Sequence, residues 1–560
     1  MGISQRLASA GESIATIRAV ARTGLLNPMR PDRFVRMAKG ARLWGTSAAA
    51  PVAMSAARHP RRIAIIDAAG SVDWATLDGR TNALANALAG RGLGGGDVVG
   101  ILCRNHRGFV EALVAAAKLG ADVVLLNTGF AAPQLAEVVE REGVTALVHD
   151  ASFDAVVDDA GLGAEMPRFV AWTMGPAASS STTAPSFDDL AATASTQVPP
   201  KPSSTGEVTI LSSGTTGTPK GARRSSATEK EGGGDGLASQ LGVLTRVPLR
   251  CGDPTLVSAP LFHTWGLSGL LTAALMSSPV VLRERFDATD AVAAIDEHRV
   301  GTFIAVPVML QRILELGDEV RAAHDLSTLH VVFLSGSALP GELATRWMDA
   351  TGDNLYNLYG STEVAAVTLA SPDDLRASPH TAGPMLPGID VRLLGDDDRE
   401  VTPGEPGRIF VRSGMVFDGY TGGGSKPVVD GYMGTGDVGR FGDAARLYVE
   451  GREDDMVISG GENVVPQEVE DVLLQHTDVV DAAVVGVPDE AFGQRLVAYV
   501  VAASGAHPDP DVLRAWVREN LANYKVPRDV VLLDRLPRNP TGKVLPRNLV
   551  SGTSDAPAED

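Results

Sequence analysis

The chain has 560 residues, of which 44% are hydrophobic and 21% are charged, and its formal net charge is −19. This length and composition predict a folded protein of several domains with sizeable hydrophobic cores. The acidic balance argues against a nucleic-acid surface, because phosphate backbones are bound through an excess of Lys and Arg. Neither Cys103 nor Cys251 lies near a His or Cys cluster, so we expect no disulfide framework, no zinc site and a reduced, cytoplasmic compartment.

The first 50 residues form a basic arm of net charge +6, which leaves −25 on the other 510 residues. Its cations alternate with apolar side chains such as Phe34, Val35 and Trp44. Such a segment suits peripheral contact of residues 1–45 with the anionic inner face of a membrane, and it equally suits a helical extension packed on its own acidic domain. No apolar run reaches the roughly 18 residues of a spanning helix, and the arm lacks the pattern of a cleaved signal.

Helical and strand periods then alternate along the chain. The spacing predicts a helix over 74–93, a strand over 97–103, a helix over 109–120 and a strand over 121–127. Alternation of this kind indicates parallel sheets covered by helices. Residues 175–206 are rich in Ala, Ser, Thr and Pro without a period, which predicts an exposed connection, and the glycine runs at 231–236 and 421–425 predict loops.

The pattern changes near Arg452, where we expect a domain boundary. Residues 447–459 resemble a hairpin with a glycine-containing turn, and 467–476 predict a helix with Val469, Val472, Leu473 and His476 on one face. Strand-like segments at 482–487 and 530–533 flank a helical segment at 511–521. Together they predict a compact α+β unit of about 100 residues. The expected parts are a basic extension (1–50), a large domain (51–452) and a small domain (453–560).

One short segment carries a chemical signal. Residues 211–221 read LSSGTTGTPKG, a run of hydroxyls and glycines that ends in a lysine. The segment does not match the usual phosphate-loop pattern, because Pro219 precedes Lys220 and Gly221 follows it. Glycines would still let backbone N–H groups approach a polyphosphate, while hydroxyls donate and the lysine offsets charge. A polar surface loop explains the composition equally well.

Five further segments change that balance. They are FLSGSALPGEL (333–343), YNLYGSTEVA (356–365), GYMGTGDVGRF (431–441), GREDDMVISGGENVVPQEVE (451–470) and PRNPTGKVLPRNL (537–549). With the 211–221 loop, they resemble in order and spacing the core motifs of the adenylate-forming superfamily, which includes the AMP-forming fatty acyl-CoA synthetases. The resemblance implies a large α/β domain of two subdomains with parallel-rich sheets plus a small β-barrel, and a smaller mobile α+β C-terminal domain.

The same resemblance implies a two-step reaction that uses ATP, Mg²⁺ and CoA. A carboxylic acid and ATP give an acyl-adenylate and pyrophosphate, and a thiol then displaces AMP. The family positions that would hold the β- and γ-phosphates correspond to Ser213, Gly214, Thr215, Thr216, Gly217 and Lys220. Thr362 and Glu363 match positions that contact phosphate and bind Mg²⁺, a hard cation suited to carboxylate and phosphate oxygens.

The nucleoside and the catalytic cation are assigned in the same way. Tyr359, in a motif with Gly360 and Ser361, resembles the residue that stacks on adenine, and Gly336, Ser337 and Ala338 resemble the opposite wall. Asp437 matches the aspartate that binds both ribose hydroxyls, and Arg452 matches an arginine on the ribose or phosphate side. Lys543 resembles the catalytic lysine, whose ammonium can stabilise the transition state between carboxylate and phosphate.

The resemblance also implies that the small domain rotates between the two steps. Asp454 falls at the hinge position, and Ser459, Gly460, Gly461 and Glu462 would line the path of the thiol. Residues 259–282 resemble the border of the acyl pocket, with His263 at its mouth and Trp265 behind. Their apolar composition favours a medium- or long-chain fatty acid, although an ordinary buried helix has the same composition. Two alternatives stay open: an adenylation enzyme that uses a carrier-protein thiol or none, and an inactive acyl- or nucleotide-binding homologue.

Overall fold

The computed structural model describes residues 20–25, 27–163, 165–174, 184–211, 220–223, 242–453, 456–459, 462–489, 493–540 and 542–551. The chain divides into two compact units. The first unit comprises Met1–Leu334 and Gly414–Ser425, and the second comprises Ser335–Ser413 and Lys426–Asp560. Among the residues that the structure describes, no helix is long and apolar enough to span a bilayer.

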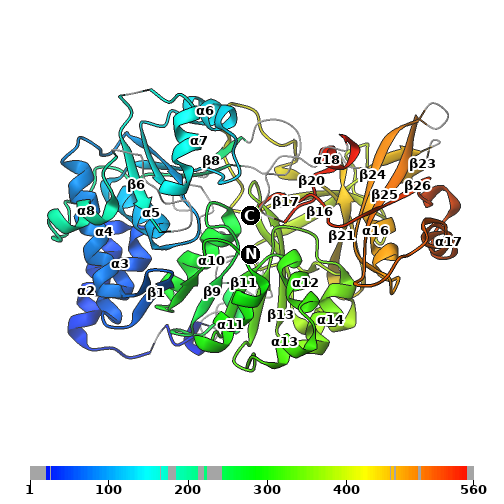
Figure 1. Ribbon diagram of the computed structural model, residues 1–560, viewed down its shortest axis with the longest axis horizontal. Helices are drawn as coiled ribbons and strands as arrows, with labels where there is room; N and C mark the ends of the chain where they lie inside the picture. The colour runs from blue at the N-terminus through cyan, green and yellow to red at the C-terminus, as the bar shows by residue number, and fades with distance from the viewer. Residues whose placement is uncertain are drawn as a thin grey trace, which may run out of the picture. The chain divides into compact units, whose positions relative to one another are not determined.

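The first unit contains a largely parallel sheet in the order β18-β8-β7-β4-β3-β5-β6. Figure 1 labels β6 and β8 of this sheet. Its parallel strands are β3 (Val98–Leu102), β4 (Asp122–Leu125), β5 (Ala146–Asp150), β6 (Arg168–Trp172) and β7 (Val208–Leu211). The short strands β8 (Gly221–Arg223) and β18 (Gly419–Tyr420) add to it in antiparallel fashion. This arrangement confirms the parallel sheet that the alternating periods indicate.

Helices cover both faces of this sheet, as expected for parallel strands. Helix α6 (Ala132–Arg141) and helix α7 (Asp154–Asp159), which follows the short η1 (Ala151–Phe153), pack on one face in a shared apolar cluster. The predicted helices at 74–93 and 109–120 are α4 (Trp74–Ala89) and α5 (Arg107–Leu119). Helix α4 begins after Asp73, whose carboxylate accepts from the Thr76 N–H at 2.7 Å, and α5 ends at Gly120 with φ 72°.

The prediction of an exposed connection without a helical period over 175–206 is wrong in part, since residues 187–193 form helix α8 (Phe187–Thr193). Ser186 caps this helix by accepting from the Asp189 N–H at 3.1 Å, and Asp188 and Asp189 occupy its first turn. Phe187 and Leu190 are buried. A helix of seven residues is too short to show a period, so its local signals are the Ser186 cap and the two acids of its first turn.

A second sheet of the first unit runs in the order β12-β11-β9-β10-β1-β2. The strands are β1 (Ile63–Asp67), β2 (Gly70–Asp73), β9 (Thr255–Val257), β10 (Val280–Leu282), β11 (Thr302–Ala305) and β12 (Val331–Leu334), and all pairs are parallel except β1 with β2. The helices of this region are α2 (Pro31–Trp44), α3 (Ala49–Arg58), α10 (Thr264–Leu275), α11 (Ala288–Glu297), α12 (Pro307–Glu315) and α13 (Asp318–Ala322).

The second unit begins with α14 (Gly341–Thr351), the antiparallel pair β13 (Leu355–Ser361) and β14 (Ala365–Ala370), and α15 (Pro372–Ala377). An antiparallel sheet in the order β15-β21-β20-β17-β16 follows, with β19 beside β20. Its strands are β15 (Gly383–Pro384), β16 (Asp390–Leu394), β17 (Gly407–Arg412), β19 (Val428–Val429), β20 (Tyr432–Phe441) and β21 (Arg446–Arg452), with the short η2 (Asp443–Ala445) before β21.

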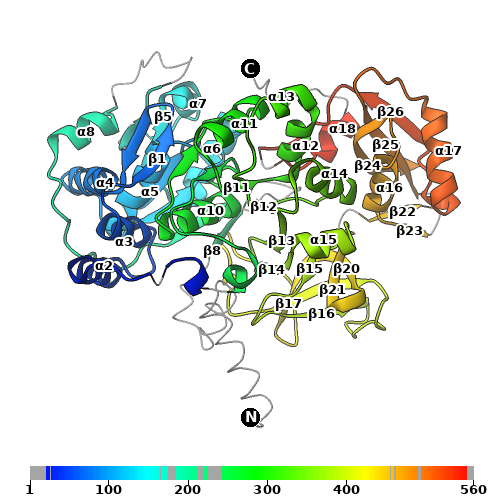
Figure 2. The same ribbon diagram turned by 90° about the horizontal axis from the view of Figure 1, so that it is seen from below.

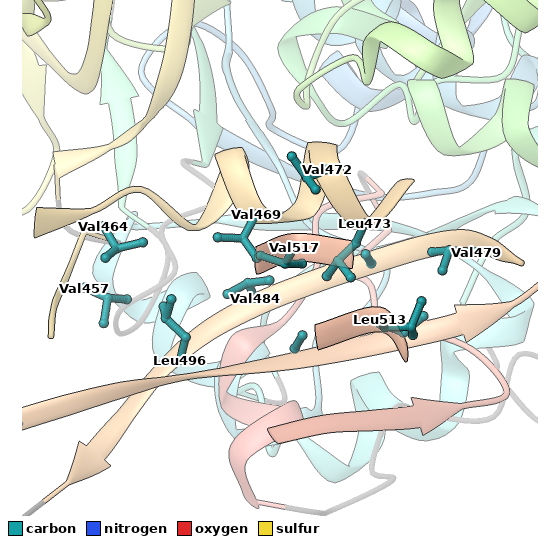
Figure 3. Packing of buried hydrophobic residues seen from close by; sticks show 13 residues of the cluster. Val457, Val464, Val469, Val472, Leu473, Val479, Val484, Leu496, Leu513 and Val517 are labelled. Atoms are coloured by element: carbon teal, nitrogen blue, oxygen red, sulfur yellow. The ribbon is translucent and has the colours of Figure 1, made fainter. Parts of the chain in front are cut away.

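The C-terminal part of the second unit is the predicted α+β fold (Figure 2). Strands β22 (Val457–Ser459), β23 (Glu462–Val464), β24 (Val479–Asp489), β25 (Gly493–Ala502) and β26 (Asp529–Leu533) form one sheet. Its helical elements are α16 (Pro466–Leu474), α17 (Pro510–Asn520), η4 (Asn523–Lys525) and α18 (Pro546–Ser551). Figure 3 shows Val469 and Leu473 of α16 packed with Val517 of α17 and Val484 of β24. The fold class is therefore confirmed, while the domain boundary near Arg452 stays a prediction.

The hairpin predicted over residues 447–459 is wrong. Strand β21 pairs with β20 and β15, whereas β22 pairs with β23 and β25, so the two strands belong to different sheets. A local pattern shows that two strands are near in sequence, but their partners are chosen by long-range packing.

Candidate active site

Asp437 lies in the middle of strand β20, directly across from Arg452 of β21. The Arg452 Nε lies 3.9 Å from the Asp437 Oδ1. The backbone N–H of Asp437 donates to the Thr435 hydroxyl at 3.0 Å, and that hydroxyl donates to the Ile409 carbonyl of β17 at 3.1 Å. The backbone of Asp437 is therefore fixed by its own sheet.

Tyr359, in strand β13, donates its hydroxyl to the Asp437 Oδ2 at 2.7 Å. Burial, followed by the nearby charge of Asp437, raises the pKa of Tyr359 well above its usual range, so the phenol remains a donor. The sequence predicts a role for the Tyr359 ring, and that role stays a prediction. The structure adds a role for the hydroxyl, which orients Asp437 and which no sequence pattern indicated.

Cations surround the same carboxylate. Burial raises the pKa of Asp437, and the hydrogen bond from Tyr359 opposes that rise most strongly, followed by the charges of Arg452, Lys543 and Lys426. Lys543 comes from the C-terminal segment, more than one hundred residues after Asp437. The structure thus brings together four of the predicted site residues, which the sequence places in separate motifs.

Gly436 makes room for two of these cations. Its φ is +83°, and a Cβ there would lie 3.1 Å from the Lys426 Nζ and 3.2 Å from the Arg452 Nη2. A side chain at this position would therefore be strained and would crowd the cations. The sequence analysis missed Lys426, because it directly follows the glycine-rich loop at 421–425 and matches no motif.

Gly360 and Ser361 end strand β13, and Thr362 and Glu363 lie in its connection to β14. A Cβ on Gly360 would lie 1.9 Å from the Ala365 carbonyl oxygen, so only glycine fits. The Ser361 hydroxyl accepts from the Glu363 N–H at 3.2 Å, which fixes the turn. Glu363 is 8% exposed. A single carboxylate beside a threonine hydroxyl suits Mg²⁺, since this ion takes its other ligands from phosphate oxygens and water.

The loop with Gly336, Ser337 and Ala338 connects β12 to α14. Gly336 has φ +95°, and all three residues are exposed or partly exposed. The side chains of these three residues are small, so a flat ring such as a nucleotide base could lie against them. Its contact with a nucleotide base stays a prediction.

Most of the predicted phosphate loop lies outside the described residues: Ser213, Gly214, Thr215, Thr216 and Gly217. Lys220 is described and exposed, and its Nζ lies 5.5 Å from the centre of the Tyr420 ring. The next residue, Gly221, opens strand β8 between Thr209, Thr421 and Glu142, where a Cβ would approach each side chain within 2.8 Å. The described end of the loop is therefore anchored to the sheet.

The predicted acyl segment forms helix α10 and strand β10. Trp265 is fixed at the start of α10, because its indole N–H donates to the Ala305 carbonyl at 3.0 Å and its ring meets Phe333 edge-on at 4.7 Å. His263 is the N-cap residue of α10, and its ring lies 4.6 Å from that of Phe262. Gly266, Leu267, Gly269 and Leu270 are buried, which leaves the helix apolar on its inner side.

The residues predicted for the second step are described in part. Ser459 and Glu462 are paired across the antiparallel strands β22 and β23. Asp454, Gly460 and Gly461 lie outside the described residues. The hinge and the thiol path therefore stay predictions.

The chain matches known protein families over most of its length. Residues 52–421 match the family "AMP-binding enzyme", and residues 468–543 match "AMP-binding enzyme C-terminal domain". Feruloyl-CoA synthase of Amycolatopsis sp. is 33% identical over 500 residues, which cover 87% of this chain and 95% of that protein. Indoleacetate–CoA ligase of Aromatoleum aromaticum is 32% identical, with coverage of 87% and 94%.

A solved structure shows the same fold. O-succinylbenzoate coenzyme A synthetase of Bacillus subtilis, in complex with ATP and magnesium ion, superposes with a TM-score of 0.74 at 28% identity, covering 89% of this chain and 99% of that chain. The expectation of an adenylate-forming enzyme is therefore confirmed. The relatives above are not named for a fatty acid, whereas a fatty acid–acyl-carrier-protein ligase of Streptomyces coeruleorubidus is 30% identical, with coverage of 88% of this chain and 94% of that protein. The chain belongs to the AMP-binding enzyme family, as an enzyme of the AMP-forming acyl-CoA ligase type.

Proposed function

We propose that the protein activates an apolar carboxylic acid with ATP and transfers the acyl group from acyl-AMP to CoA, releasing pyrophosphate and AMP. One observation carries the proposal: the Asp437 carboxylate, oriented by Tyr359, lies within the electrostatic reach of Arg452, Lys426 and Lys543. The carboxylate can accept hydrogen bonds from hydroxyl groups, and the cations can bind a phosphate beside them. A nucleotide carries ribose hydroxyls and phosphate in this arrangement.

In the first step, an oxygen of the substrate carboxylate attacks the α-phosphorus of ATP, and the bond from that phosphorus to pyrophosphate breaks. Asp437 accepts hydrogen bonds from the ribose hydroxyls, while Tyr359 and the residues 336–338 enclose the base. Lys543 stabilises the negative charge that gathers around phosphorus, which is a purely electrostatic role. When bound through Glu363 and Thr362, Mg²⁺ would further screen the phosphate charge.

In the second step, the thiol of CoA attacks the acyl carbon, its proton passes to solvent, and AMP leaves. The strand pair that holds Ser459 and Glu462 supplies part of the thiol path. Lys543 has no role in this step, because the phosphate bond has already been broken. Separate assays of the two steps can therefore distinguish the role of Lys543 from the roles of the other site residues.

The proposed acid is apolar and carries a single carboxylate. Helix α10 has no charged residue, and Trp265 and Phe333 place two aromatic rings at its start. The relatives named for feruloyl-CoA and indoleacetate favour an aromatic acid, while the apolar run of α10 also suits the fatty acid that the sequence analysis predicts. We place aryl acids first and medium- or long-chain alkyl acids second.

A single screen tests this proposal. AMP release is measured for aryl acids and for alkyl acids of rising length, each with and without CoA. We expect CoA-dependent AMP release with at least one apolar acid. Release that does not depend on CoA would favour the adenylation enzyme that uses a carrier-protein thiol or none, and the absence of ATP–pyrophosphate exchange with every acid would favour the inactive binding homologue.

We further propose that helix α2 contacts an anionic lipid surface. Its residues Phe34 and Val35 are 56% and 65% exposed, and the exposed cations Arg36, Lys39 and Arg42 lie on the same helix. Trp44 at its end is buried and packs beside Lys118, which anchors the helix to its own unit. Exposed apolar side chains among cations are typical of an interfacial helix.

The double substitution Phe34→Ser and Val35→Ser tests this contact without removing the Trp44 anchor. We expect weaker sedimentation with vesicles that contain phosphatidylserine, and no binding of either form to vesicles of phosphatidylcholine alone. Val512→Ser on α17 is the matched control, because Val512 is 52% exposed on a helix without such a cationic set. Unchanged sedimentation of the double variant would reject the contact.

A further inference from the structure

Arg538 connects the sheet of the C-terminal part to the turn that precedes Lys543. One of its guanidinium nitrogens, Nη2, donates to both carboxylate oxygens of Asp481, at 2.7 and 2.8 Å. The other, Nη1, donates to the Gly542 carbonyl at 2.6 Å. Asp481 belongs to strand β24, so the guanidinium spans from a rigid sheet to a residue directly next to the proposed catalytic lysine.

The segment that Arg538 holds is a short hairpin, described over residues 537–540 and 542–545 (the 537–545 hairpin). The Asn539 N–H donates to the Lys543 carbonyl at 2.8 Å, and the Leu545 N–H donates to the Pro537 carbonyl at 2.9 Å. The Asn539 side chain also accepts from the Lys543 N–H at 2.9 Å. The backbone of Lys543 is thus fixed on both sides within the hairpin, and the position of the hairpin decides where the ammonium can reach.

The bridge is shielded from solvent. The side chains of Arg538 and Asp481 are 19% and 14% exposed, unlike the pair Arg514 and Asp511 on α17, whose Asp511 side chain is 83% exposed. Ion pairs that are exposed to water contribute little to stability. An arginine that is shielded from water and donates to two groups also fixes the positions of those groups relative to each other. A planar guanidinium can serve the carboxylate and the carbonyl at the same time, which a lysine ammonium does less well.

We propose that Asp481 and Arg538 are positioning residues for the adenylation step, because they hold the 537–545 hairpin so that Lys543 reaches the site at Asp437. This inference rests on the proposed function. Neither residue touches the substrate, and neither belongs to the sites assigned above. Loss of the bridge leaves the ammonium of Lys543 present and charged, but it lets the hairpin move.

The first test compares the two half-reactions in Arg538→Gln and Arg538→Lys. We expect the kcat of ATP–pyrophosphate exchange to fall by about 10- to 100-fold in Arg538→Gln, because small displacements of a catalytic group have effects of this size. The KM for ATP and the thiolation of supplied acyl-AMP should change by less than about 3-fold. Arg538→Lys should recover part of the loss, and Arg514→Ala, which removes the exposed pair, should behave as wild type.

The second test asks whether Arg538 acts through Lys543. In a Lys543→Ala background, Arg538→Gln should cause no further loss of exchange, because the group that it positions is already absent. If the double variant lost exchange activity by the product of the two single losses, the proposal would be overturned. Equal loss of both half-reactions in Arg538→Gln alone would also overturn it. If Arg538→Gln does not fold, Asp481→Asn provides the same comparison, since the amide keeps an acceptor but removes the charge.

A third readout does not depend on activity. Hydrogen exchange of the 537–545 peptide should speed up in Arg538→Gln, while the α17 peptide should exchange at the wild-type rate; unchanged exchange of the hairpin would contradict the proposal. The failure of the proposed function is recognised separately, since wild-type protein would then show no ATP–pyrophosphate exchange with any acid.

Discussion

Two acids in the second unit are withdrawn from water but have opposite surroundings. Asp437 in β20 accepts from the Tyr359 hydroxyl and lies near three cations. Glu470 in α16 accepts from the Val484 N–H at 2.7 Å, but its neighbours Asp471 and Asp481 are acids. The hydrogen bond from Val484 and, after it, the charge of Arg538 act in the opposite sense. Burial and these acids raise the pKa of Glu470 to about 8.

The difference shows how one protein assigns different tasks to two partly buried carboxyl groups. Burial disfavours the charged form of both, so the partners decide which group is kept as an anion. Donors and cations favour the ionised form of Asp437, as an acceptor for hydroxyl groups requires. Glu470 keeps its proton through neutral pH and serves the packing of α16 on β24.

The largest expected effect comes from the removal of one cation near Asp437. Lys543→Ala should lower the rate of ATP–pyrophosphate exchange by about 10²- to 10³-fold, the usual effect of losing a group that stabilises transition-state charge. The thiolation of supplied acyl-AMP should stay within a few-fold of wild type, because that step breaks no bond at phosphorus. Single-turnover assays of the two half-reactions measure this split, and an equal loss in both would remove Lys543 from its proposed role.

A smaller effect follows from removing the donor to Asp437. Tyr359→Phe should lower kcat/KM for ATP by about 10- to 100-fold, since a hydrogen bond to a charged group is worth about 1.5–3 kcal/mol. That hydrogen bond lowers the pKa of Asp437, so its loss should move the acid limb of the pH profile of kcat/KM to higher pH.

Tyr448→Phe is the matched control for this change. Tyr448 lies on β21, in the same sheet as Asp437. Its hydroxyl donates to the Ser378 hydroxyl at 3.0 Å and not to Asp437. Its pH profile should match that of wild type. A Tyr359→Phe profile with an unmoved acid limb would show that the hydroxyl does not control Asp437.

The smallest effect on catalysis is expected at Glu470. The folded protein holds this proton up to about pH 8, whereas the unfolded chain loses it near the ordinary value of 4.5. Between these values folding takes up a proton, so the contribution of Glu470 to stability is full below about pH 4.5 and is lost as the pH rises through about 8.

Glu470→Gln keeps an acceptor oxygen for the Val484 N–H but cannot ionise, so it carries no negative charge at any pH. Its melting temperature should exceed that of wild type by several degrees at pH 8, and the two should converge below about pH 4.5, with activity little changed. A melting difference that is the same at every pH would mean that Glu470 does not carry this proton.

Sequence reasoning identified the parts of the site that recur as short motifs. Asp437, Arg452, Tyr359 and Lys543 were all indicated in this way, and the structure gathers them around one carboxylate. It missed Lys426, whose importance depends on the approach of a loop to Gly436 rather than on its neighbours in the chain.

The same limit explains the errors in the fold. The strands within 447–459 were recognised as strands, but their pairing into separate sheets depends on residues far along the chain. Asp481 and Arg538 are 57 residues apart, and although Arg538 lies within the 537–549 motif, nothing in the sequence indicates Asp481 as its partner. Local periods predicted α4, α5, β3 and β4 well because each of these elements buries a continuous apolar face.

The most direct test of the central claim is a crystal structure of the protein with bound AMP. We predict that both ribose hydroxyls donate to Asp437, that Tyr359 retains its hydrogen bond to the same carboxylate, and that the Lys543 ammonium faces the phosphate. AMP bound elsewhere, with Asp437 and Tyr359 untouched, would contradict the account.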